Sequence, residues 1–281
     1  MQKIKLDIIG DPVSHSKSPI IHSTVLTELG LDFEYRKVRV KKGELENYLD
    51  EAKTMGVNGF SLTMPHKKDI IGFLDYIDED ALAFDAVNTV KIEDGKLFGY
   101  NTDGQGFALA VKNRGFDFSG KNIVILGAGG AASTVALKSE MEGAKKITIL
   151  NRTLSSAEAI AKKLVKCQAE AGIFDADTIS KVVVNCDLLI NATPLGMTGV
   201  DSDFEDFSFF DYLKNDAWVF DLIYNPEETN FLKEAKSHGF NTLNGFDMLI
   251  YQGLWADKIF LELSLDFPYL KGKIKESLKN F

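Results

Sequence analysis

The segment from Asn122 to Thr153 constrains the fold more than any other part of this 281-residue chain. It opens with an apolar run at 122–126, followed by a turn with almost no side chains, Gly127-Ala128-Gly129-Gly130-Ala131-Ala132. A helix-compatible stretch follows, and a second apolar run at 146–150 ends in Asn151-Arg152-Thr153. This strand–turn–helix–strand order is typical of a dinucleotide-binding unit.

Three small residues of the turn have physical roles in such a unit. Gly127 permits the sharp turn, and Gly129 lets backbone N–H groups approach a pyrophosphate. Ala132 is small enough for the helix to pack closely on the sheet. The N-terminus of that helix carries a partial positive charge, which favours phosphate groups.

The end of the second strand indicates which nucleotide is bound. An NAD-selecting site usually places Asp or Glu there, to accept a hydrogen bond from the ribose 2′-hydroxyl. This chain has Asn151-Arg152-Thr153 instead, and an arginine pairs with a 2′-phosphate. The alternative is a solvated arginine at a strand end. Because an arginine stands where an acidic residue would select NAD, we predict NADP rather than NAD.

Composition excludes several classes of protein. A length of 281 residues favours two domains, and a net charge of −9 argues against a nucleic-acid partner. No apolar run approaches the roughly 20 residues that span a bilayer. Cys167 and Cys186 have no metal-type or redox-type spacing, and the four histidines are scattered, so we expect no metal site. Met1 leads directly into a strand pattern without a signal peptide, which favours the cytoplasm.

Strand and helix patterns alternate through the first third, which predicts a mainly parallel sheet with helices on its faces. The expected strands are 4–9, 33–40, 59–64, 87–92 and 96–100, the last two joined by a hairpin turn at Asp94-Gly95. Helices are expected at 18–29, 43–55 and 104–113. Beyond the dinucleotide unit, we expect strands at 188–192 and 219–223, a loop with a short helix at 201–211, a helix at 245–263 and a final helix.

Polar side chains gather at expected strand ends and turns of the first third. They lie in Ser14–Pro19, in Thr63–Lys67, and in Asn88-Thr89 with Asn101–Asp103. Such positions line the ligand crevice of open α/β sheets. Each also has a plain structural interpretation: the serines could cap a helix, the turn residues could form turns, and the lysine could be solvated. Together they suit a small polyhydroxylated, uncharged-to-anionic substrate.

The chain resembles the shikimate dehydrogenase family over essentially its full length. The resemblance rests on ordered motifs: Gly10–Pro19, Thr63–Lys67, Ala86–Thr89, Gly99–Gly104, Gly127–Ala131, Asn151–Thr153, Asn191–Met197, Asp221–Pro226 and Met248–Gln252. It implies a reversible, NADP-dependent reduction of 3-dehydroshikimate to shikimate, in the shikimate pathway of chorismate and aromatic amino acid biosynthesis. It also implies a small-molecule substrate, no membrane partner, and a monomer or homodimer.

The resemblance further implies two α/β domains separated by a deep cleft. Residues 1–103 would form a substrate-binding and catalytic domain with a mainly parallel sheet. Residues 104–240 would form a Rossmann-like NADP-binding domain. Residues 241–281 would be C-terminal helices that return to the first domain.

Site residues follow by position from the same resemblance. Lys67 and Asp103 correspond to the catalytic pair. The substrate contacts correspond to Ser16, Ser18, Thr63, Asn88, Tyr224 and Gln252. The cofactor contacts correspond to Gly127, Ala128, Gly129, Gly130, Ala131, Asn151, Arg152, Thr153, Ser156, Leu222 and Gly245. The chain departs from the family where Ser61 replaces the usual Asn, and where Ser156 replaces a second basic residue, so we expect a modest NADP preference.

Three rival functions remain at this point, the most distant being a tetrahydrofolate-linked dehydrogenase of similar architecture. The nearest is a quinate or dual quinate/shikimate dehydrogenase that uses NAD. Ser16-Lys17-Ser18 favours shikimate, because quinate-preferring relatives often carry Thr at the second hydroxyl position. The rival of another class is a non-catalytic NADP-binding sensor, which would keep the glycine turn and lose the Lys67–Asp103 pair.

Overall fold

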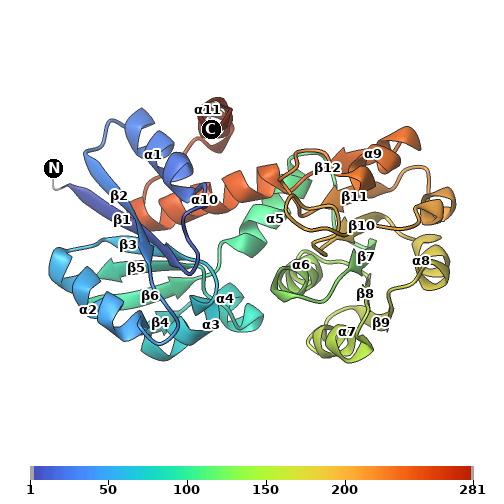
Figure 1. Ribbon diagram of the computed structural model, residues 1–281, viewed down its shortest axis with the longest axis horizontal. Helices are drawn as coiled ribbons and strands as arrows, with labels where there is room; N and C mark the ends of the chain where they lie inside the picture. The colour runs from blue at the N-terminus through green and yellow to red at the C-terminus, as the bar shows by residue number, and fades with distance from the viewer. Residues whose placement is uncertain (1–2, 280–281) are drawn as a thin grey trace. The chain divides into compact units, whose positions relative to one another are not determined.

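The computed structural model describes residues 3–279, which divide into two compact units. Unit 1 comprises the described residues up to Gly106 together with those from Ile250 onward, and unit 2 comprises Phe107–Leu249. The chain passes from one unit to the other within helices α5 (Asp103–Lys112) and α10 (Phe246–Leu261), as Figure 1 shows. In the part of the chain that the structure describes, no helix is long and apolar enough to cross a membrane.

Unit 1 is built on a six-stranded sheet with the order β2-β1-β3-β5-β6-β4. Strand β1 pairs in parallel with β2 and β3, and β4 pairs in parallel with β6, whereas β5 runs antiparallel to β3 and β6. The β5–β6 hairpin turns at Asp94 (φ 51°) and Gly95 (φ 74°), the two positive φ angles of a type I′ turn. The strands are β1 Ile4–Gly10, β2 Phe33–Arg39, β3 Gly59–Leu62, β4 Tyr76–Ile77, β5 Thr89–Glu93 and β6 Lys96–Tyr100.

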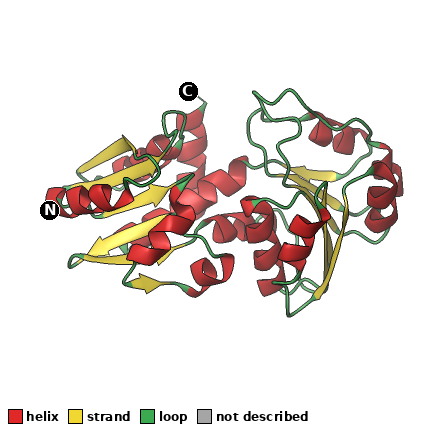
Figure 2. Cartoon of the chain, turned by 60° about the horizontal axis from the view of Figure 1, so that its bottom comes forward, coloured by secondary structure: helices red, strands yellow, loops and turns green. Residues whose placement is uncertain are grey.

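Helices cover both faces of this sheet, as Figure 2 shows with helices in red and strands in yellow. Alternate side chains of β1 point to opposite faces, so Leu6 packs with Leu26 of α1 and Phe260 of α10, whereas Ile9 packs with Leu49 of α2. This placement brings the N-terminus of α1 and the helix α10 to the same face. The helices are α1 Ser18–Glu28, α2 Leu45–Met55, α3 His66–Asp69, η1 Ile70–Phe73, α4 Glu79–Phe84 and α11 Phe267–Leu278.

Unit 2 is built on a parallel six-stranded sheet with the order β12-β11-β10-β7-β8-β9. The chain starts at the central strand β7, winds outward to β9, then returns to β10 beside β7 and winds the other way. This is the doubly wound arrangement, whose ligands bind at the carboxyl ends of the strands where the winding reverses. The strands are β7 Asn122–Leu126, β8 Lys146–Asn151, β9 Gln168–Ile173, β10 Leu188–Asn191, β11 Trp218–Asp221 and β12 Asn241–Leu243.

Two cores hold the helices of unit 2 on this sheet. On one face, Phe209 and Phe210 of η2 pack with Phe231 of α9 and with the apolar side of α8. On the other, Phe107 of α5 stacks on Phe220 with 5.7 Å between ring centroids. The helices are α6 Gly130–Met141, α7 Leu154–Ala161, α8 Ala176–Val183, η2 Ser208–Tyr212 and α9 Asn230–Ser237.

Candidate functional site

In unit 1, hydrogen bonds connect three of the side chains expected at the site, those of Lys67, Asp103 and Asn88. The Nζ of Lys67 donates to Oδ2 of Asp103 at 2.5 Å. The other carboxylate oxygen, Oδ1, accepts from Nδ2 of Asn88 at 2.9 Å. The Lys67 and Asp103 side chains keep 32% and 25% of their surface exposed, so both remain accessible to a ligand.

Asn88 is the buried centre of this cluster. Its Oδ1 accepts from the backbone N–H of Thr102 at 2.8 Å and from the hydroxyl of Thr89 at 3.0 Å. The hydroxyl of Thr102 reaches Oε1 of Gln252 on α10 at 3.4 Å. Because Asn88 immediately precedes β5 and Thr102 follows β6, the hairpin register sets the Asp103 carboxylate beside Asn88. The role of Thr102 was not anticipated from the sequence.

The other substrate residues of unit 1 lie on neighbouring elements. Thr63 follows β3, and its methyl group lies so close to Gly10 that a Cβ on Gly10 would approach it to 2.3 Å. Ser18 is the first residue of α1 and is buried, and its backbone N–H donates to the hydroxyl oxygen of Ser16 at 3.2 Å. Ser16 thus satisfies one N–H at the start of α1, which gives the capping interpretation a partial basis. Its hydroxyl proton remains available to a ligand.

In unit 2, the turn between β7 and α6 has the geometry that the glycine motif predicted. Gly127 has a φ of 107°, and a Cβ there would lie 2.8 Å from the carbonyl oxygen of Ala192, so only glycine fits. Gly129 and Gly130 face open space, with nothing within 4 Å of an added Cβ. The first turn of the 12-residue helix α6 contains no acidic residue. This combination suits a bound pyrophosphate.

The end of β8 presents the residues expected at the adenosine ribose. Asn151 ends the strand, and its Nδ2 donates to the carbonyl oxygen of Thr153 at 3.0 Å, which shapes the turn into α7. Arg152 is exposed and Ser156 lies half-buried on the first turn of α7. The guanidinium is therefore accessible to an anionic group.

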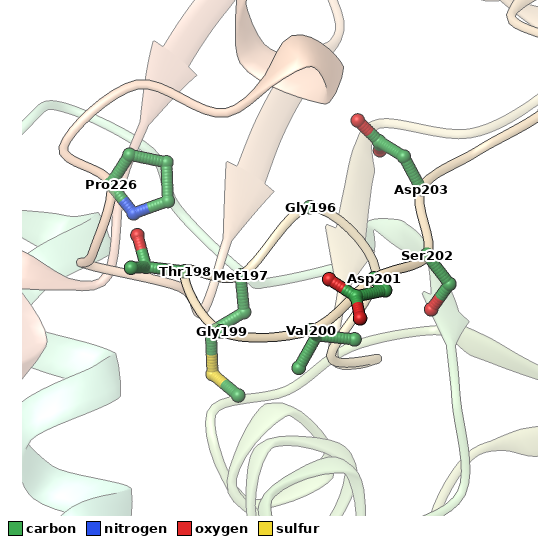
Figure 3. Close-up of a pocket in the computed structure, with 9 residues that line it drawn as sticks. All are labelled: Gly196, Met197, Thr198, Gly199, Val200, Asp201, Ser202, Asp203 and Pro226. Carbon is green, nitrogen blue, oxygen red and sulfur yellow. The ribbon is translucent and has the colours of Figure 1, made fainter.

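Two loops follow β10 and β11 at the same edge of the sheet. They line a hollow of about 420 Å³ formed by residues 196–203 and Pro226, which Figure 3 shows in close-up. Thr198 joins the loops, because its backbone N–H donates to the carbonyl oxygen of Asn225 at 3.0 Å. The second loop carries Leu222 and the exposed Tyr224, two of the expected ligand residues.

Asp221, the last residue of β11, has no exposed surface. Burial raises the pKa of its carboxyl to about 6, although hydrogen bonds from Thr229, Ile223 and Asn191 act in the opposite direction. Asp221 and Asn191 lie in motifs of the family resemblance, which assigned neither of them a role. The signal was available, because each is a polar residue that ends an apolar strand.

The raised pKa of Asp221 predicts a pH-dependent stability. The folded state holds this proton more tightly than the unfolded chain, whose carboxyl titrates near pH ~3.9. The contribution of Asp221 to the free energy of unfolding should therefore fall as the pH rises from about 4 to about 6, and stay constant above. The side chain of Asp221→Asn cannot ionise. The free energy of unfolding of this variant, relative to that of the wild type, should therefore increase by roughly 2–3 kcal/mol as the pH rises between these limits. Urea unfolding of both proteins at pH 4.5 and 8 measures the difference, and a difference independent of pH would contradict it.

The fold and the site together define a class, a two-unit α/β dehydrogenase with a dinucleotide-binding sheet in its second unit. Family models match most of the chain: a shikimate dehydrogenase substrate binding domain at residues 8–90, and a shikimate/quinate 5-dehydrogenase domain at residues 108–198. A shikimate dehydrogenase (NADP+) from Methanocaldococcus jannaschii is 43% identical over 277 residues, which cover 97% of this chain and 96% of the relative. The chain belongs to the shikimate dehydrogenase family.

Solved structures with the same fold extend this comparison. A 5-ketofructose reductase of Gluconobacter superposes with a TM-score of 0.87 at 34% identity, covering 98% of this chain and 99% of the other. A shikimate 5-dehydrogenase from Listeria monocytogenes in complex with shikimate and NAD superposes with a TM-score of 0.87 at 33% identity, covering 96% of each chain. Related proteins thus differ in substrate and in cofactor.

Proposed function

We propose that this chain catalyses the reversible, NADP-dependent reduction of 3-dehydroshikimate to shikimate, with unit 1 as the substrate-binding unit and unit 2 as the cofactor-binding unit. The observation that carries the proposal is the accessible Lys67–Asp103 pair, held by the buried Asn88. A non-catalytic sensor has no need of this pair. The identities of the substrate and the cofactor are inferred from membership of the family.

Lys67 is suited to move the proton of the reaction. When a ring ketone is reduced, negative charge develops on its oxygen, and a nearby ammonium stabilises that charge and delivers a proton. In the reverse direction the amine accepts the proton of the shikimate hydroxyl. Asp103 holds Lys67 through one oxygen and is itself held by Asn88 through the other, so the ammonium is oriented before the substrate binds.

The substrate carboxylate is assigned to the hydroxyls of Ser16 and Ser18 at the start of α1. Two hydroxyl donors beside a helix N-terminus are suited to an anion. Thr63, Asn88 and Gln252 are assigned to the ring hydroxyls, and we assign Tyr224 of unit 2 as a further substrate contact.

NADP fits the residues of unit 2, where it supplies or accepts the hydride. The N–H groups of the turn Gly127–Ala131 would bind its pyrophosphate, and Asn151, Arg152, Thr153 and Ser156 would bind the adenosine ribose and its 2′-phosphate. Leu222 and Gly245 are assigned to the nicotinamide. The open space at Gly129 and Gly130 is what close approach of a phosphate requires.

We place this reaction in the cytoplasm and expect the chain to act as a monomer or a homodimer. Both cysteines are free, and burial raises the pKa of each thiol to about 12. Little thiolate therefore forms at neutral pH, so neither cysteine is suited to redox chemistry. Free, unreactive cysteines are compatible with a reducing compartment.

Product identification tests this function directly. Purified protein is incubated with NADPH and 3-dehydroshikimate, 3-dehydroquinate or 5-ketofructose, and the products are identified by chromatography. We expect shikimate as the main product. Formation of quinate or of a reduced fructose derivative at a higher rate would assign the chain to one of its relatives' activities instead.

Ser16→Ala should raise KM for shikimate several-fold with a smaller effect on kcat, because a carboxylate contact is present in the ground state and the transition state alike. Thr24→Val is the control, since it removes a hydroxyl within α1 itself, one that donates to the carbonyl oxygen of Ile20 and contacts the hydroxyl of Ser277. Steady-state kinetics and thermal unfolding are measured on both variants. If Ser16 only caps the helix, its loss lowers the melting temperature and leaves KM unchanged.

A further inference from the structure

A single buried carboxyl connects the two loops that follow β10 and β11. The Oδ1 of Asp221 accepts from Nδ2 of Asn191 at 3.0 Å and from the backbone N–H of Ile223 at 3.0 Å. Its Oδ2 accepts from the hydroxyl of Thr229 at 2.6 Å. Such a group is costly to bury unless its hydrogen bonds are made, so these three donors and Asp221 hold one another in place.

The donors come from three separate segments of unit 2. Asn191 ends β10, and its own Oδ1 accepts from both the backbone N–H and the hydroxyl of Thr193, at 3.0 and 2.7 Å. Thr229 is the N-cap of α9, where its hydroxyl oxygen accepts from the backbone N–H of Leu232 at 3.3 Å. Through Asp221, the start of the first loop, the turn of the second and the start of α9 therefore form one network.

This network fixes the position of the backbone at Leu222. The Leu222 N–H donates to the carbonyl oxygen of Asn191 at 3.0 Å, and the Gly245 N–H donates to the carbonyl oxygen of Ile223 at 3.0 Å. A Cβ at Gly245 would lie 2.0 Å from the Leu222 carbonyl oxygen, so no side chain fits there. The position of Leu222 is thus set from one side by Asn191 and Asp221 and from the other by Gly245.

The location gives this network a functional meaning. Strand β10 lies beside β7, where the winding of the sheet reverses, and Asn191 and Asp221 are paired at the carboxyl ends of β10 and β11. Doubly wound sheets bind their ligands at this edge. The hollow in Figure 3 is lined by the same two loops, yet Asp221 itself is fully buried and does not line it.

We propose that Asp221 is a positioning residue for the cofactor. Its three hydrogen bonds fix the Leu222 turn and the Thr193 segment in the geometry that receives the nicotinamide end of NADP, while the carboxyl itself contacts no ligand. The proposal rests on the proposed function for the identity of the cofactor. It concerns geometry rather than charge, so a side chain that keeps the hydrogen-bond pattern should suffice.

Four variants separate positioning from folding. Asp221→Ala removes all three acceptor contacts, and Thr229→Val removes one. Asp221→Asn can keep the pattern, because its carbonyl oxygen can accept from Asn191 and Ile223 while its amide donates to the Thr229 oxygen. Asp175→Ala is the matched control in the same unit, since Asp175 caps α8 by accepting from the Thr178 N–H at 2.8 Å.

Calorimetric titration with NADP+ and shikimate oxidation kinetics are measured on all four, with thermal unfolding. We expect Asp221→Ala to raise Kd for NADP+ by about tenfold or more and to lower kcat, because small displacements of cofactor-binding groups have large effects on rate. Thr229→Val should show the same change to a smaller extent, and Asp221→Asn should stay within about threefold of wild type. Asp175→Ala should lower the melting temperature only.

The outcomes distinguish the two proposals. Unchanged Kd and kcat in Asp221→Ala, with a lower melting temperature, would overturn the positioning role, as would an Asp221→Asn protein as impaired as Asp221→Ala. If Asp221→Ala does not fold, the positioning role is tested by comparing Kd for NADP+ and kcat of Thr229→Val with those of Asp175→Ala. A wild-type protein that binds NADP+ without oxidising shikimate would refute the proposed function, whereas the Kd values of the variants would still test the role of Asp221.

Discussion

Lys67→Ala should lower kcat for shikimate oxidation by about 10²–10⁴-fold, the usual contribution of a general acid or base. KM for shikimate should change much less, because the Lys67 side chain acts mainly on the proton transfer and the charge of the transition state. Steady-state kinetics at saturating NADP+ measure both constants.

The neighbouring lysine supplies the control for this result. Lys68 carries the same charge one residue later, has 68% of its side chain exposed, and pairs with Asp85 at 2.7 Å. Lys68→Ala should therefore keep wild-type kinetics. A Lys67→Ala protein that retained most of its turnover would remove Lys67 from the mechanism, and equal losses in both variants would point to a general effect on folding or charge.

Arg152→Ala should lower kcat/KM for NADP by about 10–150-fold, which corresponds to roughly 1.5–3 kcal/mol for a charge-assisted contact. The corresponding value for NAD should hardly change, since NAD lacks the 2′-phosphate. We expect the lower end of this range, because Ser156 stands where a second basic residue would help and Arg152 is exposed to screening. The preference should also shrink with added salt.

Lys146 is the matched control for the loss of Arg152. It lies at the opposite end of the same strand, β8, where it pairs with Glu170 at 2.8 Å. Lys146→Ala should leave the NADP-to-NAD ratio unchanged. If Arg152→Ala reduced activity equally with both cofactors, Arg152 would act through the adenine or the fold rather than through the 2′-phosphate.

The dinucleotide turn could be predicted from the sequence because its requirements are local. Gly127 must adopt a positive φ beside Ala192, and the apolar runs on either side have the length of buried strands. The predicted strands at 122–126 and 146–150 were confirmed to within one position, and a helix lies between them as expected. The same holds for the hairpin at Asp94-Gly95, whose residue types specify its turn.

Strands β9 and β12 could not be predicted in the same way. The sequence of β9, Gln168–Ile173, includes Ala169, Glu170 and Gly172, which favour strands weakly. The strand lies at the edge of the sheet, and three of its six residues are exposed. Pairing with β8 makes it a strand, and that pairing is a tertiary effect. Strand β12 has only three residues, too few for any periodicity to be visible.

The site shows the same division between local and distant requirements. Lys67 and Asp103 are separated by 36 positions, so no spacing rule indicates that they meet, and the family resemblance alone linked them. The structure confirms their contact, while their catalytic role stays a prediction. Asp221 was overlooked because a polar residue at a strand end is common, and its importance depends on donors 30 residues before it and 8 after it.

The most direct test of the proposed function is a comparison of kcat/KM values of the wild-type protein. Shikimate and quinate are each oxidised with NADP+ and with NAD+. Formation of the reduced cofactor is followed by absorbance. We predict the highest value for shikimate with NADP+, exceeding shikimate with NAD+ by about tenfold, and little activity on quinate. A higher value for quinate, or for NAD+ over NADP+, would contradict the assignment of substrate or cofactor, respectively.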